Sequence, residues 1–138
     1  MPKAKHNYTV LVVEDEHPIA EAIKKKLDTN GFTVVLARSV SQALEQLKNT
    51  RGIQGVWLDH YLIGGKSGLD LVAQMKSKKS KWKEIPIFVV SNTAGADKIR
   101  AYLCLGVDKY YTKCGFSIQT IINDIKKFLD RGESYLIQ

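Results

Sequence analysis

The sequence predicts an α/β fold in which a single domain forms a doubly wound five-stranded parallel sheet, (βα)5, with helices on both faces. Five short apolar runs alternate along the chain with five amphipathic segments. Strands that are apolar throughout are typical of sheets buried on both faces, and right-handed crossovers place helices on both sides. The length of 138 residues and the hydrophobic content of 44% fit one domain with an ordinary core.

The expected strands are short, rich in β-branched residues and bounded by turn residues. They are residues 8–13, 32–37, 55–59, 85–91 and 107–112.

The first helical segment starts near Pro18 and stops before Asn30 and Gly31, since proline suits a first turn and glycine a C-terminus. Either Ser39 or Ser41 can cap the second segment. The remaining segments, each with an apolar stripe at helical spacing, are 69–75, 96–105 and 118–129.

Charge and composition narrow the class of protein. The net charge is +7, and much of it lies in two lysine-rich runs, 24–26 and 76–83. We interpret these runs as lysines that complement the dipole at helix C-termini, not as a nucleic-acid-binding surface, because no nucleic-acid-binding motif accompanies them. No apolar stretch approaches the ~20 residues of a membrane helix, and no secretory signal is present. Cys104 and Cys114 lack ligand spacing, so we expect reduced thiols in a cytoplasmic protein.

Acidic residues follow two of the expected strands. Glu14, Asp15 and Glu16 come directly after the first strand, and Asp59 closes the third. Adjacent carboxylates repel unless a cation lies among them, and ligands of parallel sheets bind at the carboxyl ends of strands. Glu14, Asp15 and Asp59 together predict an oxygen cage for a hard divalent cation such as Mg²⁺.

The ends of the other strands add groups that suit phosphoryl transfer. Ser91 ends the fourth strand and Lys113 follows the fifth. A carboxylate such as Asp59 can attack phosphorus, while a lysine neutralises phosphoryl oxygens and a hydroxyl donates to one of them. Taken alone, Asp59 is equally well explained as a loop cap. The combination predicts a metal-assisted phosphoryl acceptor.

From Tyr8 to Leu129 the sequence resembles the receiver domain of two-component response regulators, of the chemotaxis-regulator type of the flavodoxin-like fold. The resemblance implies the strand order 2-1-3-4-5. It implies that Glu14 and Asp15 hold Mg²⁺ and that Asp59 is the phosphoacceptor.

The resemblance also gives roles to four further residues. Tyr61 would offer its backbone carbonyl to the metal, Ser91 would contact the phosphoryl group, and Lys113 would pair with it. Tyr110 stands where the family has its aromatic switch residue, which reorients together with Ser91. We therefore expect phosphorylation to change a surface made by the fourth helix, the fifth strand and the fifth helix.

Partners and domain limits follow from the same resemblance. A sensor histidine kinase or a histidine phosphotransfer protein would donate the phosphoryl group, and a downstream target protein would receive the signal. We expect neither direct nucleic-acid binding nor membrane insertion. The domains expected are an N-terminal tail at 1–7, the receiver at 8–131 and a C-terminal tail at 132–138. Since about nine residues follow the last helix, we expect a stand-alone receiver without an output domain.

Some positions depart from the family pattern. Cys114 replaces the usual proline after the lysine, Asn92 replaces a small residue beside the phosphoryl site, and Ile63 replaces a loop proline. The alternative is a pseudo-receiver, an interaction module that works without phosphorylation. An enzyme with an aspartyl intermediate is disfavoured, because the haloacid-dehalogenase type needs a second aspartate where Tyr61 stands. His60 is expected to be a solvated loop residue.

Overall fold

The computed structural model describes residues 7–62, 64–92 and 95–137, with side chains through Arg131. Ile63 and nearly all of the expected N-terminal tail lie outside the described residues. The strands form one sheet in the order β2-β1-β3-β4-β5, and every neighbouring pair is parallel. They are β1 (Thr9–Val13), β2 (Thr33–Ala37), β3 (Ile53–Leu58), β4 (Ile87–Ser91) and β5 (Lys109–Thr112). The predicted fold class and strand order are confirmed.

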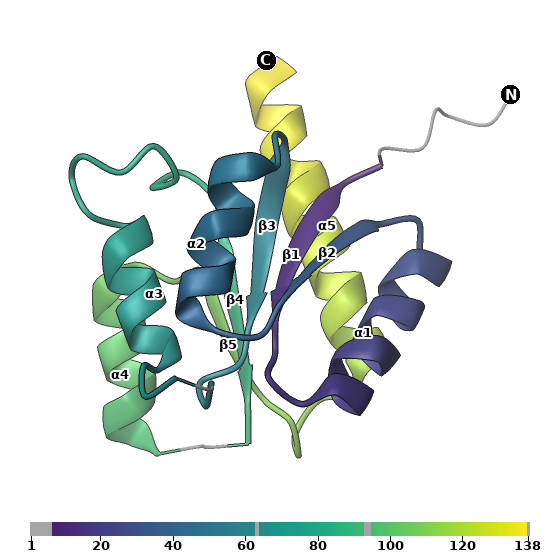
Figure 1. The fold of residues 1–138 in the computed structure, drawn as a ribbon. Coiled ribbons are helices and arrows are strands. Elements are labelled where there is room, and N and C mark those ends of the chain that lie inside the picture. Colours follow the sequence, from purple (N-terminus) through teal and green to yellow (C-terminus); the bar gives the residue numbers. More distant parts are fainter. Residues whose placement is uncertain (1–6, 63, 93–94, 138) are drawn as a thin grey trace, which may run out of the picture.

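A helix follows each strand, and the helices form two layers (Figure 1). The helices are α1 (His17–Thr29), α2 (Val40–Asn49), α3 (Gly68–Met75), α4 (Ala96–Leu105) and α5 (Ile118–Ile137). One hydrophobic cluster joins α2, α3 and α4 to one face of the sheet, and a second joins α1 and α5 to the other. The inner strand β1 is buried on both faces, since none of its residues from Val10 to Val13 is exposed.

Local signals explain most helix ends. Ser39, rather than Ser41, caps α2, because its Oγ accepts the Gln42 N–H at 3.1 Å. The helix α4 ends at Gly106, whose φ of 104° is a left-handed conformation that glycine adopts without strain. A capping box between Ser67 and Asp70, which was not predicted, starts α3.

One predicted helix end is wrong. The last helix does not end near Leu129, because the backbone of α5 continues to Ile137. Gly132 costs about 1 kcal/mol in a helix interior, which does not by itself stop a helix.

The lysine-rich run 76–83 lies only in part at a helix end. Lys76 is the C-cap of α3, which has no basic residue in its last turn. The rest of the run belongs to the loop that projects at the upper left of Figure 1.

Three strands begin two residues away from their expected positions. β3 starts earlier, at Ile53, whereas β4 and β5 start later, at Ile87 and Lys109. Pro86 precedes β4, and a proline has no N–H to give to a sheet. Asp108 lies just before β5, and its side-chain carboxylate accepts the Ile87 N–H at 2.9 Å. This side-chain hydrogen bond joins the starts of β4 and β5. The carboxyl ends of the strands, which carry the candidate site, are placed as expected to within one residue.

Candidate functional site

Strand register brings the first two acidic positions together. Val13 pairs with Leu58 at the ends of β1 and β3, and the Asp59 N–H donates to the Val13 carbonyl at 3.0 Å. On the other side of β1, the Glu14 N–H donates to the Ala37 carbonyl at 2.9 Å. Backbone pairing therefore holds Glu14 and Asp59 beside each other where the central strands end.

Register at the next pair of strands adds a hydroxyl and an ammonium group. Ser91 pairs with Thr112, and the Lys113 N–H donates to the Ser91 carbonyl at 2.9 Å. The Ser91 side chain is fully buried. Lys113 Nζ lies 3.4 Å from Glu14 Oε1, an ion pair whose carboxylate is 1% exposed. The lysine therefore reaches from β5 to the acidic end of β1.

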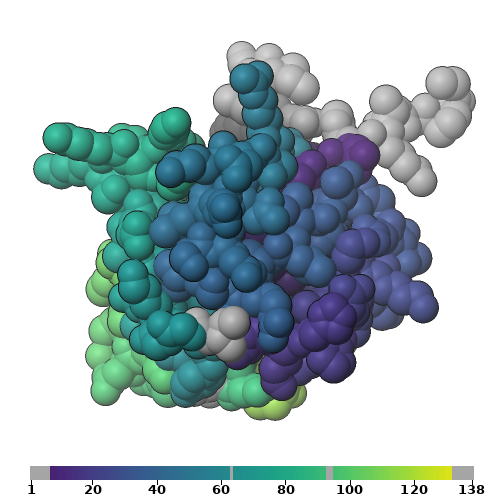
Figure 2. Space-filling model, viewed as in Figure 1, coloured from purple at the N-terminus to yellow at the C-terminus, as the bar shows by residue number. Residues whose placement is uncertain are grey.

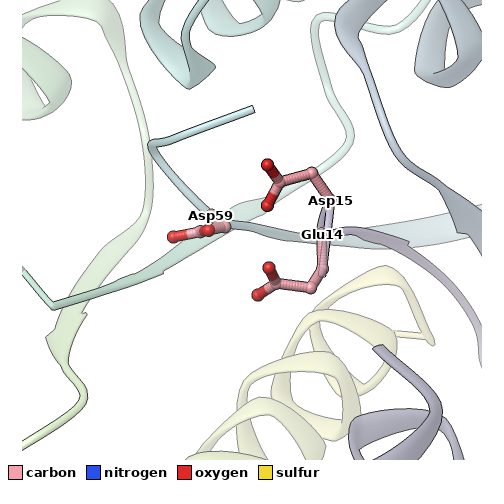
Figure 3. Close-up of side chains that lie close together, drawn as sticks. All are labelled: Glu14, Asp15 and Asp59. Carbon is pink, nitrogen blue, oxygen red and sulfur yellow. The ribbon is translucent and has the colours of Figure 1, made fainter. Parts of the chain in front are cut away.

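Glu14, Asp15 and Asp59 form a cluster of carboxylates. One oxygen from each lies within 4.8 Å of the others, and Figure 3 shows the three groups turned to the same side. Oxygens on opposite sides of a Mg²⁺ ion are about 4 Å apart, so this spacing fits a small hard cation. Glu16 is not part of the cluster; it is exposed, and its N–H donates to Glu14 Oε2 at 3.2 Å.

The electrostatics of the cluster support cation binding. Burial, the charge of the neighbouring Glu14 and, least of the three, the charge of Asp15 together raise the pKa of Asp59 to about 7. Lys113 and the His60 N–H oppose this rise in the Asp59 pKa without cancelling it. Because burial and like charge both disfavour the ionised form, a bound cation would stabilise the Asp59 carboxylate.

His60, next to Asp59, is not the solvated loop residue that was expected. Its side chain is buried at 6% exposure, and its Nδ1 lies 2.6 Å from the hydroxyl of Tyr102 on α4, which is fully buried. The His60 N–H also donates to Asp59 Oδ1 at 2.9 Å. Burial lowers the pKa of His60, so the neutral imidazole is favoured. His60 thus connects the Asp59 carboxylate with α4, a link that local sequence does not reveal.

The two expected switch residues are in contact. Tyr110 is half-buried in β5, and its ring centroid lies 5.8 Å from that of Tyr102. Burial raises the pKa of Tyr110, and a hydrogen bond with the Ser91 side chain acts in the opposite direction. In this conformation Tyr110 is therefore turned inward, against the hydroxyl that was expected to contact a phosphoryl group.

Tyr61 is the most exposed of the predicted site residues. Its side chain is 55% exposed, and its hydroxyl accepts from Lys98 Nζ at 3.2 Å. The metal-binding role assigned to its backbone carbonyl stays a prediction.

Two of the three residues that depart from the family pattern lie at the surface, and the third, Ile63, is outside the described residues. Asn92 and Cys114 are both exposed, so neither side chain is packed into the carboxylate cluster. The described backbone contains no cis peptide bond, so the one that joins Lys113 and Cys114 is trans. A further contact was not foreseen: Arg38 donates to the Asp15 backbone carbonyl at 3.1 and 3.2 Å, which ties the β2 end to the acidic loop.

Within the described ranges, no helix combines the length and the apolar character needed to cross a membrane.

Comparison with known proteins identifies the family. Residues 10–126 match the model of the response regulator receiver domain. The phosphate regulon transcriptional regulatory protein PhoB of Escherichia coli (strain K12) is 35% identical over 123 residues, which cover 88% of this chain and 52% of that protein. Response regulator MprA of Mycobacterium sp. (strain KMS) is 28% identical over 122 residues, which cover 88% of this chain and 50% of that protein. The chain thus spans about half the length of these curated relatives.

Solved structures agree with this assignment. The receiver domain of the Francisella response regulator 1452 superposes with a TM-score of 0.80 at 26% identity, covering 91% of this chain and 99% of that one. A CheY-like receiver domain protein from Methanospirillum hungatei JF-1 has the same fold, with a TM-score of 0.82 at 21% identity over 94% of this chain and 99% of that one. The chain therefore belongs to the family of response regulator receiver domains, the signalling domains of two-component systems.

Proposed function

We propose that this receiver accepts a phosphoryl group on Asp59 and, in response, changes a protein-binding surface. The observation that carries the proposal is the cluster of Glu14, Asp15 and Asp59, whose carboxylate oxygens lie within 4.8 Å of one another. Glu14 and Asp59 are buried, Asp15 is half-buried, and Lys113 pairs with one of these carboxylates, Glu14. One ammonium group does not balance three carboxylates, so a further cation would stabilise the cluster.

The donor would be a sensor histidine kinase or a histidine phosphotransfer protein. In the transfer, a carboxylate oxygen of Asp59 forms a bond to phosphorus while the phosphorus–nitrogen bond of the donor phosphohistidine breaks. The electron pair of the broken bond stays on the imidazole, which takes up a proton. The domain would promote its own phosphorylation and later dephosphorylation by orienting groups around Asp59, rather than by turning over an external substrate.

Each neighbouring residue has a defined part in this proposal. Glu14, Asp15, Asp59 and the Tyr61 carbonyl would hold Mg²⁺, which when bound screens charge on the phosphoryl oxygens. Lys113 reaches Glu14 at 3.4 Å and would move its ammonium group to a phosphoryl oxygen. Ser91, fully buried beside it, would donate its hydroxyl to another oxygen.

The output surface would include α4, β5 and α5. If Ser91 turns to the phosphoryl group, its hydrogen bond with Tyr110 is lost, and the packing of Tyr110 against Tyr102 and α4 can then change. Leu103 on α4 and Phe116 after β5 are 51% and 43% exposed, which gives a target protein apolar groups to contact. We keep the predicted cytoplasmic setting and the bounds 8–131 of the receiver as parts of this proposal.

The test is a titration of ¹⁵N-labelled protein with Mg²⁺ and then beryllofluoride, a stable mimic of the phosphoryl group. We expect Mg²⁺ to shift the amides of residues 14–16 and 59–60, and beryllofluoride to shift those of Ser91, Lys113 and the exposed side of α4. Asp59→Asn should abolish the second set of shifts.

Each other outcome contradicts part of the proposal. Binding without shifts on α4 or β5 would contradict the switching surface. Failure of both reagents to bind would instead indicate a pseudo-receiver that acts without phosphorylation.

A further inference from the structure

A second candidate site lies at the opposite end of the sheet from Asp59. Two adjoining hollows, of about 250 and 490 Å³, share Lys48 at the end of α2 and Trp82 in the α3–β4 loop. We call them together the Trp82 hollow. Its lining residue Ile53 begins β3, whose other end leads to Asp59. Since a six-residue strand spans about 20 Å, this surface is separate from the carboxylate cluster.

The floor of the Trp82 hollow is apolar and rigidly supported. Leu47 and Ile53 are buried members of the core cluster, and Trp82 and Ile85 are half-buried against the same cluster. The smaller hollow is lined by all four of these residues. An apolar side chain of a partner could therefore be buried here without rearranging the domain.

The α3–β4 loop that forms one wall has a defined conformation. Lys76 Nζ donates to the backbone carbonyls of Lys83 and Ile85, both at 2.9 Å. The Trp82 N–H donates to Ser80 Oγ at 3.0 Å. These bonds hold Trp82 in place, so the hollow is formed before any partner arrives.

The rim of the hollow is strongly basic. Lys48, Arg51 and Lys81 line it, and all three are exposed. Among the described residues, none of the three is paired with a carboxylate. Of the residues that line the two hollows, one is acidic: Glu45, at the edge of the larger hollow. In Figure 2 this end of the molecule is at the top, where the teal loop projects to the upper left and the blue end of α2 lies beside it.

We propose that the Trp82 hollow binds an acidic segment of a partner protein, with an apolar side chain of that segment packed on Trp82 and carboxylates paired with Arg51 and Lys81. Charge complementarity selects an anionic partner. The apolar floor selects a polypeptide, since a phosphate backbone has no group to bury there.

A nucleic acid fits this surface less well. Single strands bind by stacking bases on exposed aromatic faces, whereas Trp82 is half-buried against the core. Glu45 would also repel phosphates along the edge of the larger hollow. The proposed interaction is independent of phosphorylation on Asp59 and adds a second docking surface to the receiver.

The test uses ¹⁵N-labelled protein and three probes: a short aspartate- and glutamate-rich peptide with one central leucine, its asparagine- and glutamine-substituted counterpart, and single-stranded oligothymidylate. Binding is followed by amide shifts and by the Trp82 indole signal, which Trp82→Phe identifies against that of buried Trp57. We expect the acidic peptide alone to shift residues 47–53 and 80–85 at moderate salt.

A matched pair of variants separates a specific site from general attraction to a basic protein. Arg51→Glu with Lys81→Glu should weaken peptide binding by about tenfold or more, whereas Lys126→Glu with Lys127→Glu should change it by less than about twofold. Lys126 and Lys127 are exposed on α5, in the other helix layer, and their reversal makes the same change in net charge.

Four results would overturn the proposal. They are no shift with the acidic peptide, equal binding of the uncharged peptide, equal weakening by both variant pairs, and binding of oligothymidylate at this surface in preference to the peptide. Uptake of beryllofluoride by the Arg51 and Lys81 variant shows that the domain is folded, so a failure here is distinct from a failure at Asp59.

Discussion

Asp59 is a carboxylate in a buried position beside a like charge, and both conditions disfavour its ionised form in the absence of a cation. The residue is 7% exposed and lies beside buried Glu14, and burial together with the charge of Glu14 raises the pKa of Asp59 to about 7. The backbone pairing at the end of β3 nevertheless keeps it in place. A phosphoacceptor needs such a position, because the same surroundings that disfavour its charge exclude water and hold the groups that would stabilise a phosphoryl group.

Asp59→Asn should stabilise the metal-free domain at neutral and higher pH. The folded pKa lies above the unfolded value, so the wild type loses stability as pH rises from about 4 to about 7, while the neutral amide does not. Since each pKa unit corresponds to about 1.4 kcal/mol, we expect a gain of about 2–4 kcal/mol at pH 8 that shrinks toward zero near pH 4.

Urea unfolding in the presence of a chelator measures this difference. The control is Glu45→Gln, an exposed carboxylate on α2, which should change the free energy of unfolding by less than about 0.5 kcal/mol at any of these pH values. A gain for Asp59→Asn that is the same at pH 4 and pH 8 would contradict the assignment of the raised pKa to Asp59.

Tyr102→Phe should destabilise the domain by about 1–2 kcal/mol, because it leaves buried His60 Nδ1 without its hydrogen-bond partner at 2.6 Å. Tyr61→Phe is the matched control, since its side chain is 55% exposed, and should cost less than about 0.5 kcal/mol. Equal losses in the two variants, measured by denaturant unfolding, would show that the His60–Tyr102 bond does not contribute.

At the scale of elements, α3 and α4 meet closely at one glycine. A Cβ added to Gly68, the first residue of α3, would lie 2.5 Å from Tyr102 Oη and 3.0 Å from the Asp59 backbone carbonyl. Both atoms are held by surrounding structure. The close approach of α3 to the site therefore depends on the absence of a side chain at this position.

Gly68→Ala should consequently destabilise the domain by about 1–3 kcal/mol, although alanine is the better helix former. Gly95→Ala, at the N-cap of α4, is the control, since its Cβ would meet nothing within 4 Å. Because part of the clash is with the Tyr102 hydroxyl, the double variant Gly68→Ala with Tyr102→Phe should lose less than the sum of the two single losses. Strict additivity in thermal unfolding would contradict this contact.

The elements also show how far local sequence determines this fold. Apolar runs predicted all five strands and their carboxyl ends, since β-branched stretches and turn residues are local signals. The end of α5 was missed because the apolar stripe ends at Leu129 and Gly132 follows soon after, although one glycine does not stop a helix. The His60–Tyr102 bond and the Trp82 hollow were missed because each joins residues from different elements, which pairing and packing bring together only in the folded chain.

For the molecule as a whole, the carboxyl ends of the strands hold the acidic cluster, and the amino ends of β3 and β4 lie near the Trp82 hollow. The sheet is the rigid body between them, with both faces covered by helices. The candidate acids could be predicted from sequence because parallel strands deliver their ends to one edge. Ser91 and Lys113 were also candidates from their places at strand ends, whereas the proposed role of Tyr110 came only from the family resemblance. In the structure Lys113 pairs with Glu14, and Tyr110 is hydrogen-bonded with Ser91.

Mg²⁺ should stabilise the whole domain through this cluster. At a concentration ten times the dissociation constant, a ligand that binds only the folded state adds about 1.4 kcal/mol to the free energy of unfolding. Asp15→Asn should lose most of this gain, whereas Glu16→Gln, whose exposed carboxylate lies outside the cluster, should keep it. Equal stabilisation of both variants, compared by urea unfolding with and without Mg²⁺, would place the cation elsewhere.

The most direct test of the central claim is the intact mass of the protein after incubation with acetyl phosphate and Mg²⁺. Our account predicts a gain of one phosphoryl group in the wild type and in Glu16→Gln. It predicts no gain in Asp59→Asn or in wild type treated with a chelator. A phosphoryl group that persists in Asp59→Asn, or no gain in the wild type under conditions where beryllofluoride also fails to bind, would contradict the claim that Asp59 is a metal-assisted phosphoacceptor.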